Sequence, residues 1–208
     1  MIIFDIGCCH GHWIAANYTT IDNFIGVEAN KASYHTAKER FADDTNIEIL
    51  HYLVAAYDFE MIPFYVAQNS AGESSTASEW WVKNSRHIET EHWNNPIKVF
   101  SITLDNLISR YGEPGLIKID VEGYEYEVLK GLTQKVPMLC FEYAEEQKDE
   151  IVKSINYLLQ LGYTGFNIQH GDQFNYRPSE WMTRKHLFNS VNELETFRKQ
   201  RWGMLWAK

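Results

Sequence analysis

Residues 116–132, LIKIDVEGYEYEVLKGL, decide the fold that the sequence predicts. The apolar, largely β-branched run 116–121 is typical of a strand that a parallel sheet buries on both faces. After Asp120 the apolar residues recur at helical spacing, so we expect a helix that Asp120 caps and that ends near Gly131. The stretch therefore predicts a strand followed directly by a helix.

Three carboxylates lie where this strand ends and this helix begins, namely Asp120, Glu122 and Glu125. Open α/β sheets bind their ligands beyond the carboxyl ends of their strands. We therefore expect a binding site here. Glu122 and Glu125 also fit a simpler interpretation, in which each is a first-turn acid that the helix dipole stabilises.

Strands alternate with helices along the rest of the chain. We expect strands over residues 2–6, 24–27, 47–56, 61–68, 99–103, 136–143 and 163–169, a hairpin return at 174–176, and helices over 13–18, 30–41, 104–111, 145–161 and 191–205. This alternation predicts an α/β fold with a mostly parallel sheet and helices on both faces. Without a repeat or a linker, residues 1–208 are expected to form a single domain.

Composition and charge exclude several classes of protein. The 208 residues are 45% hydrophobic and 23% charged, which is ordinary for one globular domain. A net charge of -9 argues against a nucleic-acid partner. No run approaches the roughly 20 apolar residues of a membrane helix, and the N-terminus begins a strand rather than a signal peptide, so we expect a cytoplasmic protein without a membrane span. The three cysteines fit no disulfide framework and are expected to be reduced.

Residues 69–95 differ from the rest of the chain in composition, because they are rich in Asn, Ser, Glu and Trp. The segment is longer than the ~12 to 15 residues usual for a connection without secondary structure. We interpret it as a lid, in which Ser74, Ser75, Trp80 and Trp81 close over the bound molecules and exclude water.

The turn DIGCCHG after the first strand places Gly7 and Gly11 where the backbone can approach a ligand. Glu28, at the end of the next strand, is placed to accept hydrogen bonds from two ribose hydroxyls. Dinucleotide and S-adenosylmethionine sites share these features. The dinucleotide fingerprint G-x-G-x-x-G is absent, however, because Cys9 and His12 occupy its second and third glycine positions. This favours a nucleoside with an amino-acid tail.

Three stretches resemble one family: FDIGCCHG near the start, VEAN at Glu28, and SITLDNLI followed by IKIDVEGYEYEVLKGL over residues 101–132. The chain is similar there to FkbM-type S-adenosylmethionine-dependent methyltransferases, and the third stretch is the most specific. The resemblance implies a Rossmann-like class I methyltransferase fold with a mostly parallel seven-stranded sheet. It also implies S-adenosylmethionine as methyl donor and O-methylation of a sugar or glycan hydroxyl. Cys8, Cys9 and Ala29 depart from the family's usual residues.

The resemblance also assigns single positions around the cofactor. These are Asp5, Gly7 and Gly11 in the glycine loop, Glu28 at the ribose, and Ala55 or Ala56 at the adenine. His10 is a loop histidine that we expect to touch the cofactor or the acceptor, with simple exposure to solvent as the alternative. The residues alone support Asp5, Glu28 and Asp120 as carboxylates at strand ends.

Methyl transfer to an alcohol needs alignment above all, and a base that accepts the hydroxyl proton helps. The candidates are Asp120, Glu122, Glu142 and a histidine. Asp120 and Glu142 are predicted to end neighbouring strands, where they would orient the acceptor or, as a second hypothesis, share a divalent cation. The H-x-H pair at His10 lacks a third ligand in register, so we assign no metal ligands.

Lys118 alternates with Asp120 in a strand predicted to be buried on both faces. A buried charge needs a partner, so we expect Lys118 to pair with a carboxylate, with Asp5 as the first candidate, and to act as a structural brace.

Two other functions fit the same pattern. One is a nicotinamide-dependent sugar oxidoreductase or epimerase, and the other is a non-catalytic nucleotide-binding domain. The chain opens on its first strand without a preceding helix, which suits a domain cut from a larger polypeptide that also carries glycosyltransferase domains.

Overall fold

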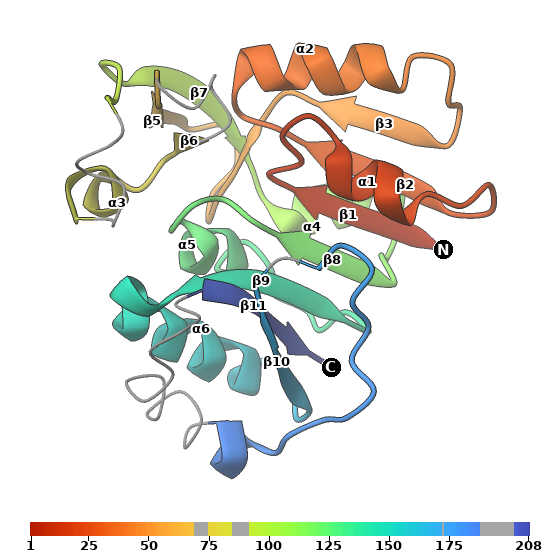
Figure 1. Cartoon of the computed structure of the whole chain (residues 1–208), viewed down its shortest axis with the longest axis vertical. Coiled ribbons are helices and arrows are strands. Elements are labelled where there is room, and N and C mark those ends of the chain that lie inside the picture. Colours follow the sequence, from red (N-terminus) through yellow and green to blue (C-terminus); the bar gives the residue numbers. More distant parts are fainter. Residues whose placement is uncertain (69–74, 85–91, 172, 188–201) are drawn as a thin grey trace.

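The computed structural model describes residues 1–68, 75–84, 92–171, 173–187 and 202–208. Within them the chain forms a seven-stranded sheet in the order β10-β11-β9-β8-β1-β2-β3 (Figure 1). Its strands are β1 (Ile2–Ile6), β2 (Asn23–Val27), β3 (Ile47–Leu50), β8 (Leu116–Ile119), β9 (Leu139–Ala144), β10 (Phe166–His170) and β11 (Trp202–Ala207).

Most of this sheet is parallel, as predicted. Strands β9, β8, β1, β2 and β3 pair in parallel, and β11 runs antiparallel between β9 and β10. The carboxyl ends of the parallel strands therefore meet at one edge, which is the edge where ligands of open α/β sheets bind.

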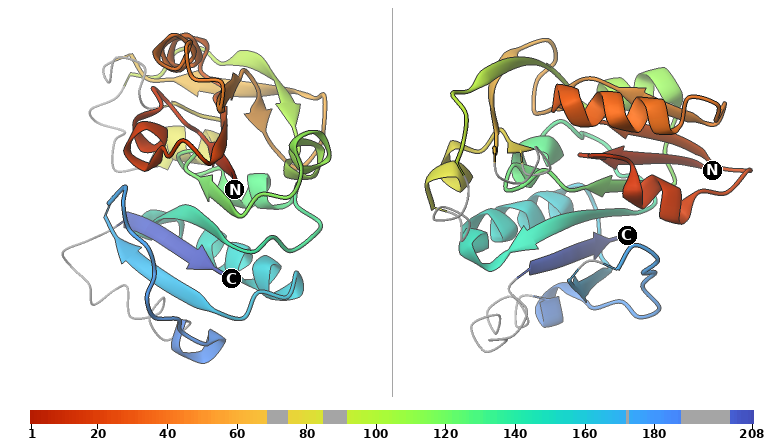
Figure 2. Two further views of the ribbon diagram at one scale, coloured as in Figure 1. Left: turned by 90° about the vertical axis from the view of Figure 1, so that its right-hand side faces the viewer. Right: turned by 45° about the horizontal axis from the view of Figure 1, so that its top comes forward.

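Helices cover both faces of the sheet, because alternate residues of each strand point to opposite sides. On one face, Ile3, Phe24 and Leu116 pack with α1 (His12–Asn17) and α2 (Lys31–Arg40). On the other, Phe4, Ile6, Ile117 and Phe141 pack with α4 (Leu104–Tyr111), α5 (Glu125–Leu129) and α6 (Lys148–Gln160). Figure 2 shows the arrangement of the helices around the sheet from two sides. The α/β fold with helices on both faces is confirmed.

A second, smaller sheet stands beside the first. It has the order β4-β7-β5-β6 and is accompanied by a short helix, α3. The bounds are β4 (Leu53–Val54), β5 (Met61–Val66), β6 (Ser75–Thr76), β7 (Ile97–Ile102) and α3 (Glu79–Asn84). The single strand predicted over 47–56 is therefore wrong, since β3 pairs with β2 in the large sheet whereas β4 pairs with β7 in the small one.

The helix predicted over residues 191–205 is also wrong where it can be tested. Residues 191–201 lie outside the described part of the chain, and residues 202–205 belong to β11. Because β11 is hydrogen bonded on both sides, pairing with neighbours overrides the weak local preference of this segment. Strand β10 pairs with β11 and not with the hairpin return that we expected over residues 174–176. In that segment, the ring of Tyr176 packs near the ring of Trp206.

A turn separates β8 from α5, where the sequence predicted an immediate helix. Glu122 and Gly123 have φ angles of 54° and 86°, which a right-handed helix does not allow. The helix therefore begins at Glu125 with Tyr124 as its N-cap, and Asp120 does not cap it. The side chain of Asp120 is held instead by Lys118.

None of the helices in the described part of the chain combines the length and the apolar character that crossing a membrane requires.

Gly203→Ala should destabilise the protein, because a Cβ there would lie 2.0 Å from the carbonyl oxygen of Gln169 in the paired strand β10. We expect a loss of about 1–3 kcal/mol in the free energy of unfolding, measured by urea denaturation. Gly115→Ala is the control, since its Cβ would meet only the flexible side chain of Met1. Equal losses in the two variants would contradict this account of β11.

Candidate active site

A cleft opens at the carboxyl ends of β1, β2 and β8 and encloses about 680 Å³ of space, including solvent at its mouth. Three carboxyl residues line it, Glu28, Asp120 and Glu122, and the described lining contains no Lys, Arg or His. Its apolar wall comes largely from the small sheet and the segment that leads to it, with Tyr52, Leu53, Val54 and Phe64. The cleft thus combines an apolar wall with an acidic floor.

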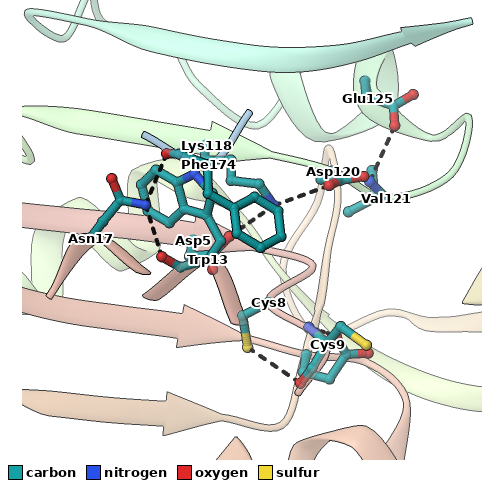
Figure 3. Close-up of polar contacts among 11 residues, drawn as sticks. Asp5, Cys8, Cys9, Trp13, Asn17, Lys118, Asp120, Val121, Glu125 and Phe174 are labelled. Atoms are coloured by element: carbon teal, nitrogen blue, oxygen red, sulfur yellow. Dashed lines mark hydrogen bonds and ion pairs between the residues drawn. The ribbon is translucent and has the colours of Figure 1, made fainter. Parts of the chain in front are cut away.

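Lys118 lies beneath this floor with its ammonium group between two carboxylates. Its Nζ is 3.2 Å from Asp5 Oδ1 and 3.1 Å from Asp120 Oδ2, as Figure 3 shows. The parallel register of β1 and β8 sets Asp5 opposite Lys118, and the ring of Trp13 lies 5.9 Å from Nζ. The predicted pairing of Lys118 with Asp5 is confirmed, and Asp120 is a second partner.

Asp5 is fully buried, and its second oxygen, Oδ2, has no hydrogen-bond partner among the described residues. Burial raises the pKa of Asp5, and the positive charge of Lys118 opposes that rise. Asp120 also raises it, because two carboxylates share one ammonium group. When Asp5, Lys118 and Asp120 are all ionised, the three side chains together therefore carry a net charge of -1.

The glycine loop after β1 uses its amide groups internally. The N–H groups of Gly7 and Cys8 both donate to the carbonyl oxygen of Val27, and that of Gly11 donates to Cys8. The N–H of Cys9 donates to Glu28 Oε2 at 2.8 Å. Because these donors are already satisfied, the loop offers them to no pyrophosphate, in contrast to a dinucleotide-binding loop.

Gly7 and Gly11 are required by contacts within the protein. A Cβ at Gly7 would lie 1.9 Å from the carbonyl oxygen of Asp120, and one at Gly11 would lie 2.3 Å from the ring of Phe41. Both residues also have a positive φ. The glycine spacing that we attributed to close ligand approach thus lets the loop pack against β8 and against the end of α2.

Glu28 ties the end of β2 to the glycine loop. Its Oε1 accepts a hydrogen bond from the N–H of Asn30 at 2.7 Å, while Oε2 accepts the one from Cys9. Burial raises the pKa of Glu28 to about 7, although both backbone hydrogen bonds oppose this. A carboxylate can accept about four hydrogen bonds, so Glu28 can accept one from a ligand while keeping its backbone partners.

Contacts on two sides stabilise the turn at residues 121–124, one set from α5 and α6 and the other from the predicted lid. Inside, Glu125 Oε1 accepts hydrogen bonds from the N–H groups of Val121 and Gly123, both at 3.1 Å. Glu125 lies in the first turn of α5, as the simpler interpretation of the sequence expected, and its side chain is buried. From the α6 side, Gln147 Nε2 donates to the carbonyl oxygen of Gly123 at 3.3 Å.

On the opposite side, two residues of the predicted lid, Thr76 and Trp81, contact the same turn. Thr76 Oγ1 donates to the carbonyl oxygen of Glu122 at 2.7 Å, and the buried Trp81 packs so closely that a Cβ on Gly123 would lie 2.9 Å from its ring. Ser75 lines the cleft, as the lid interpretation expected. Ser74 and the other lid residues in 69–74 and 85–91 lie outside the described residues.

The structure brings some of the predicted site residues together and leaves others apart. Those that line the cleft are Gly7, Glu28, Asp120 and Glu122. Those outside its lining are Asp5, His10, Gly11, Ala55, Ala56 and Glu142. Leu53 and Val54 face the cleft where Ala55 and Ala56 were expected. The roles of the outlying residues in binding or catalysis stay predictions.

Glu142 lies on β9, the strand next to β8. Burial raises its pKa well above the usual range, and the nearby carboxylates of Asp120, Glu122 and Glu125 raise it further. A carboxyl group that tends to stay protonated is a poor ligand for a cation. Within the described residues, no group of three or more His, Cys, Asp or Glu side chains is arranged to hold a metal ion.

Comparisons with known proteins point to one family. A family model described as the methyltransferase FkbM domain matches residues 5–164. No curated protein sequence matches the chain.

Solved structures give more distant likenesses. Precorrin-6y C5,15-methyltransferase from Geobacter metallireducens GS-15 is 10% identical with a TM-score of 0.48, over 100% of this chain and 79% of that one. Fibrillarin from Aeropyrum pernix, solved with natively bound S-adenosyl-L-methionine, is 10% identical with a TM-score of 0.49, over 99% of this chain and 65% of that one. A SAM dependent methyltransferase from Aquifex aeolicus is 9% identical with a TM-score of 0.45, over 100% and 81%. These likenesses say nothing about the acceptor.

Lys118→Met should destabilise the protein by about 3–5 kcal/mol, because it leaves the buried Asp5 carboxylate without its cation. The double variant Asp5→Asn with Lys118→Met should recover most of this loss, since a neutral pair needs no counter-charge. Urea denaturation followed by circular dichroism measures both. The brace is disproved if Lys118→Met keeps full stability.

Stability should fall as the pH rises from about 4.5 to about 7. Burial raises the pKa of Glu125 from 4.5 to about 7, so the native state holds a proton that the unfolded state has lost in this window. Glu125→Gln keeps an acceptor oxygen and cannot ionise. Between pH 4.5 and 7.5, we expect the wild type to lose up to about 3 kcal/mol more of its unfolding free energy than Glu125→Gln loses.

The control for this titration is Glu39→Gln, an exposed residue of α2, which should follow the wild-type pH dependence. Parallel curves for Glu125→Gln and the wild type would show that the pKa of Glu125 is the same in the native and unfolded states.

Proposed function

Because this chain belongs to the FkbM family of S-adenosylmethionine-dependent methyltransferases, we propose that it transfers a methyl group from S-adenosylmethionine to a hydroxyl group of a sugar or glycan. Its α/β fold, a mostly parallel seven-stranded sheet with helices, is the Rossmann-like fold of class I methyltransferases. The observation that carries the proposal is the cleft itself, with three carboxyl residues and no basic side chain in its described lining.

The charge of the cleft fits this cofactor better than a dinucleotide. S-adenosylmethionine carries a positive sulfonium, which the carboxylates of Asp120 and Glu122 complement. A pyrophosphate would meet the same negative charges, and the amides of Gly7, Cys8, Cys9 and Gly11 already have partners. These contacts argue against the nicotinamide-dependent alternative.

The remaining parts of the cofactor also have matching surfaces. Glu28 lines the cleft at the end of β2, where its carboxyl group can accept a hydrogen bond from the ribose. Leu53, Val54 and Phe64 form an apolar wall on which a flat adenine ring can lie.

Asp120 is the residue best placed to act on the acceptor. When bound, the cofactor supplies an activated methyl group: as the new O–C bond forms, the C–S bond breaks and its electron pair stays on sulfur. The acceptor hydroxyl must lose its proton, and we assign that proton to Asp120, whose side chain is 30% exposed in the cleft. Lys118 fixes Asp120 through Oδ2, which leaves Oδ1 to face the acceptor.

Two further carboxyl groups are given lesser roles. Glu122 lines the cleft beside Asp120, and we propose that it orients the acceptor. Glu142 lies on the next strand, and with its raised pKa it is proposed as a hydrogen-bond donor to the acidic cluster rather than as a metal ligand.

Asp120→Asn should lower kcat by about 100-fold to 10,000-fold, the range typical of a lost general base, and should change the affinity for S-adenosylhomocysteine little. Lys118 keeps Asp5 as a partner in this variant, so the fold should persist. Methyl release from labelled S-adenosylmethionine onto a panel of sugars measures kcat, and calorimetry measures the affinity. The exposed Glu39→Gln serves as control.

The same calorimetry separates the alternatives. The proposal requires binding of S-adenosylhomocysteine and none of NAD, and it fails if NAD binds instead. Binding of the cofactor without methyl release onto any sugar would indicate the non-catalytic alternative.

A further inference from the structure

A second hollow lies beside the cofactor cleft, between α3 on one side and α5 with α6 on the other. It is lined by residues 77–80, by the turn and helix residues Gly123, Tyr124 and Glu127, and by residues 146–150 with Val152 and Lys153. This hollow, called here the α3–α6 groove, encloses about 1500 Å³ of space including open solvent. It thus encloses more space than the cofactor cleft.

The groove and the cleft share a wall. Ala77 and Tyr124 line both of them. Burial raises the pKa of Tyr124 to about 12, so its hydroxyl stays protonated at neutral pH and can donate or accept a hydrogen bond. The two hollows therefore adjoin at these two side chains, and the cleft on the far side of them is lined by Asp120 and Glu122.

The described lining of the groove is strongly acidic. Five carboxyl residues stand against two lysines, the carboxylates being Glu79, Glu127, Glu146, Asp149 and Glu150 and the lysines Lys148 and Lys153. Three of these carboxylates are paired locally, Glu127 with Lys130 at 2.6 Å, Glu150 with Lys153 at 2.6 Å, and Glu79 with Lys83. One carboxylate remains in excess over the lysines that line the groove or pair with its lining, which disfavours an anionic occupant, and the carboxylate oxygens can accept hydrogen bonds from hydroxyl groups.

Trp80 supplies a flat apolar surface in this acidic groove. The indoles of the adjacent residues Trp80 and Trp81 have opposite environments: Trp81 is 2% exposed and packs on the turn, whereas Trp80 is 43% exposed and lines the groove. Core packing explains Trp81 alone. An exposed aromatic ring surrounded by carboxylates matches a pyranose, which has an apolar C–H face and a rim of hydroxyl groups.

We propose that the α3–α6 groove is the acceptor site and that it selects a neutral sugar ring, which stacks on Trp80 while the surrounding carboxylates accept its hydroxyl hydrogen bonds. This inference rests on the proposed methyltransferase function. It also orders the reactions: a nucleotide sugar carries a pyrophosphate, which the groove repels, so methylation follows glycosyl transfer and acts on a finished glycoside.

Saturation-transfer NMR tests the proposal on the full chain with saturating S-adenosylhomocysteine, which keeps the cofactor cleft occupied. The probes are methyl pyranosides and the UDP-sugars that match them. We expect the pyranosides to receive saturation at their ring C–H protons and the UDP-sugars to receive far less. Trp80→Ala should weaken pyranoside binding about tenfold, the size expected for a lost aromatic contact, without changing the affinity for S-adenosylhomocysteine.

Phe100→Ala is the matched control, since Phe100 is an aromatic residue of β7 that is 55% exposed and lines neither hollow. A second variant, Asp149→Lys, should raise binding of the UDP-sugars severalfold by reducing the negative excess.

The inference is overturned if UDP-sugars bind as well as the pyranosides, if Trp80→Ala binds like Phe100→Ala, or if neither kind of probe binds while S-adenosylhomocysteine does. Loss of S-adenosylhomocysteine binding itself would instead refute the proposed function.

Discussion

The ammonium group of Lys118, held between the carboxylates of Asp5 and Asp120, is the interaction on which the site depends. Burying three ionisable groups is costly, and mutual attraction offsets that cost only in close geometry. The parallel register of β1 and β8 provides this geometry by setting Asp5 opposite Lys118. The same contact fixes the direction of Asp120 at the floor of the cleft, so the buried ion pair and the carboxylate that we propose as the base share one cation.

Much of the fold could be predicted from the sequence because its signals are local. The β-branched run before Asp120 and the Thr103 cap of α4 act through neighbours in the chain. The C-terminal strand β11 could not be predicted, since its two partners lie far away along the chain, in β9 and β10. The turn at residues 121–124 was missed for a related reason: Glu122 adopts a positive φ that only its surroundings stabilise.

The site was predictable to a similar degree. Carboxylates at strand ends identified Glu28 and Asp120, because parallel strands bring their ends to one edge whatever the loops do. Nothing in the sequence indicated that Tyr52 and Phe64 line the cleft, because an aromatic residue in a predicted strand is usually interpreted as part of the hydrophobic core. The burial of Glu125 was hidden as well, because its partners are backbone amides that the turn creates.

The turn at residues 121–124 has one more consequence. It is a common wall of both hollows, held by Thr76 from one side and by Glu125 and Gln147 from the other. A movement of this turn would therefore change the shape of both hollows. If a ligand in one hollow changes the affinity of the other hollow for its own ligand, thermodynamic linkage requires the reverse effect to have the same size.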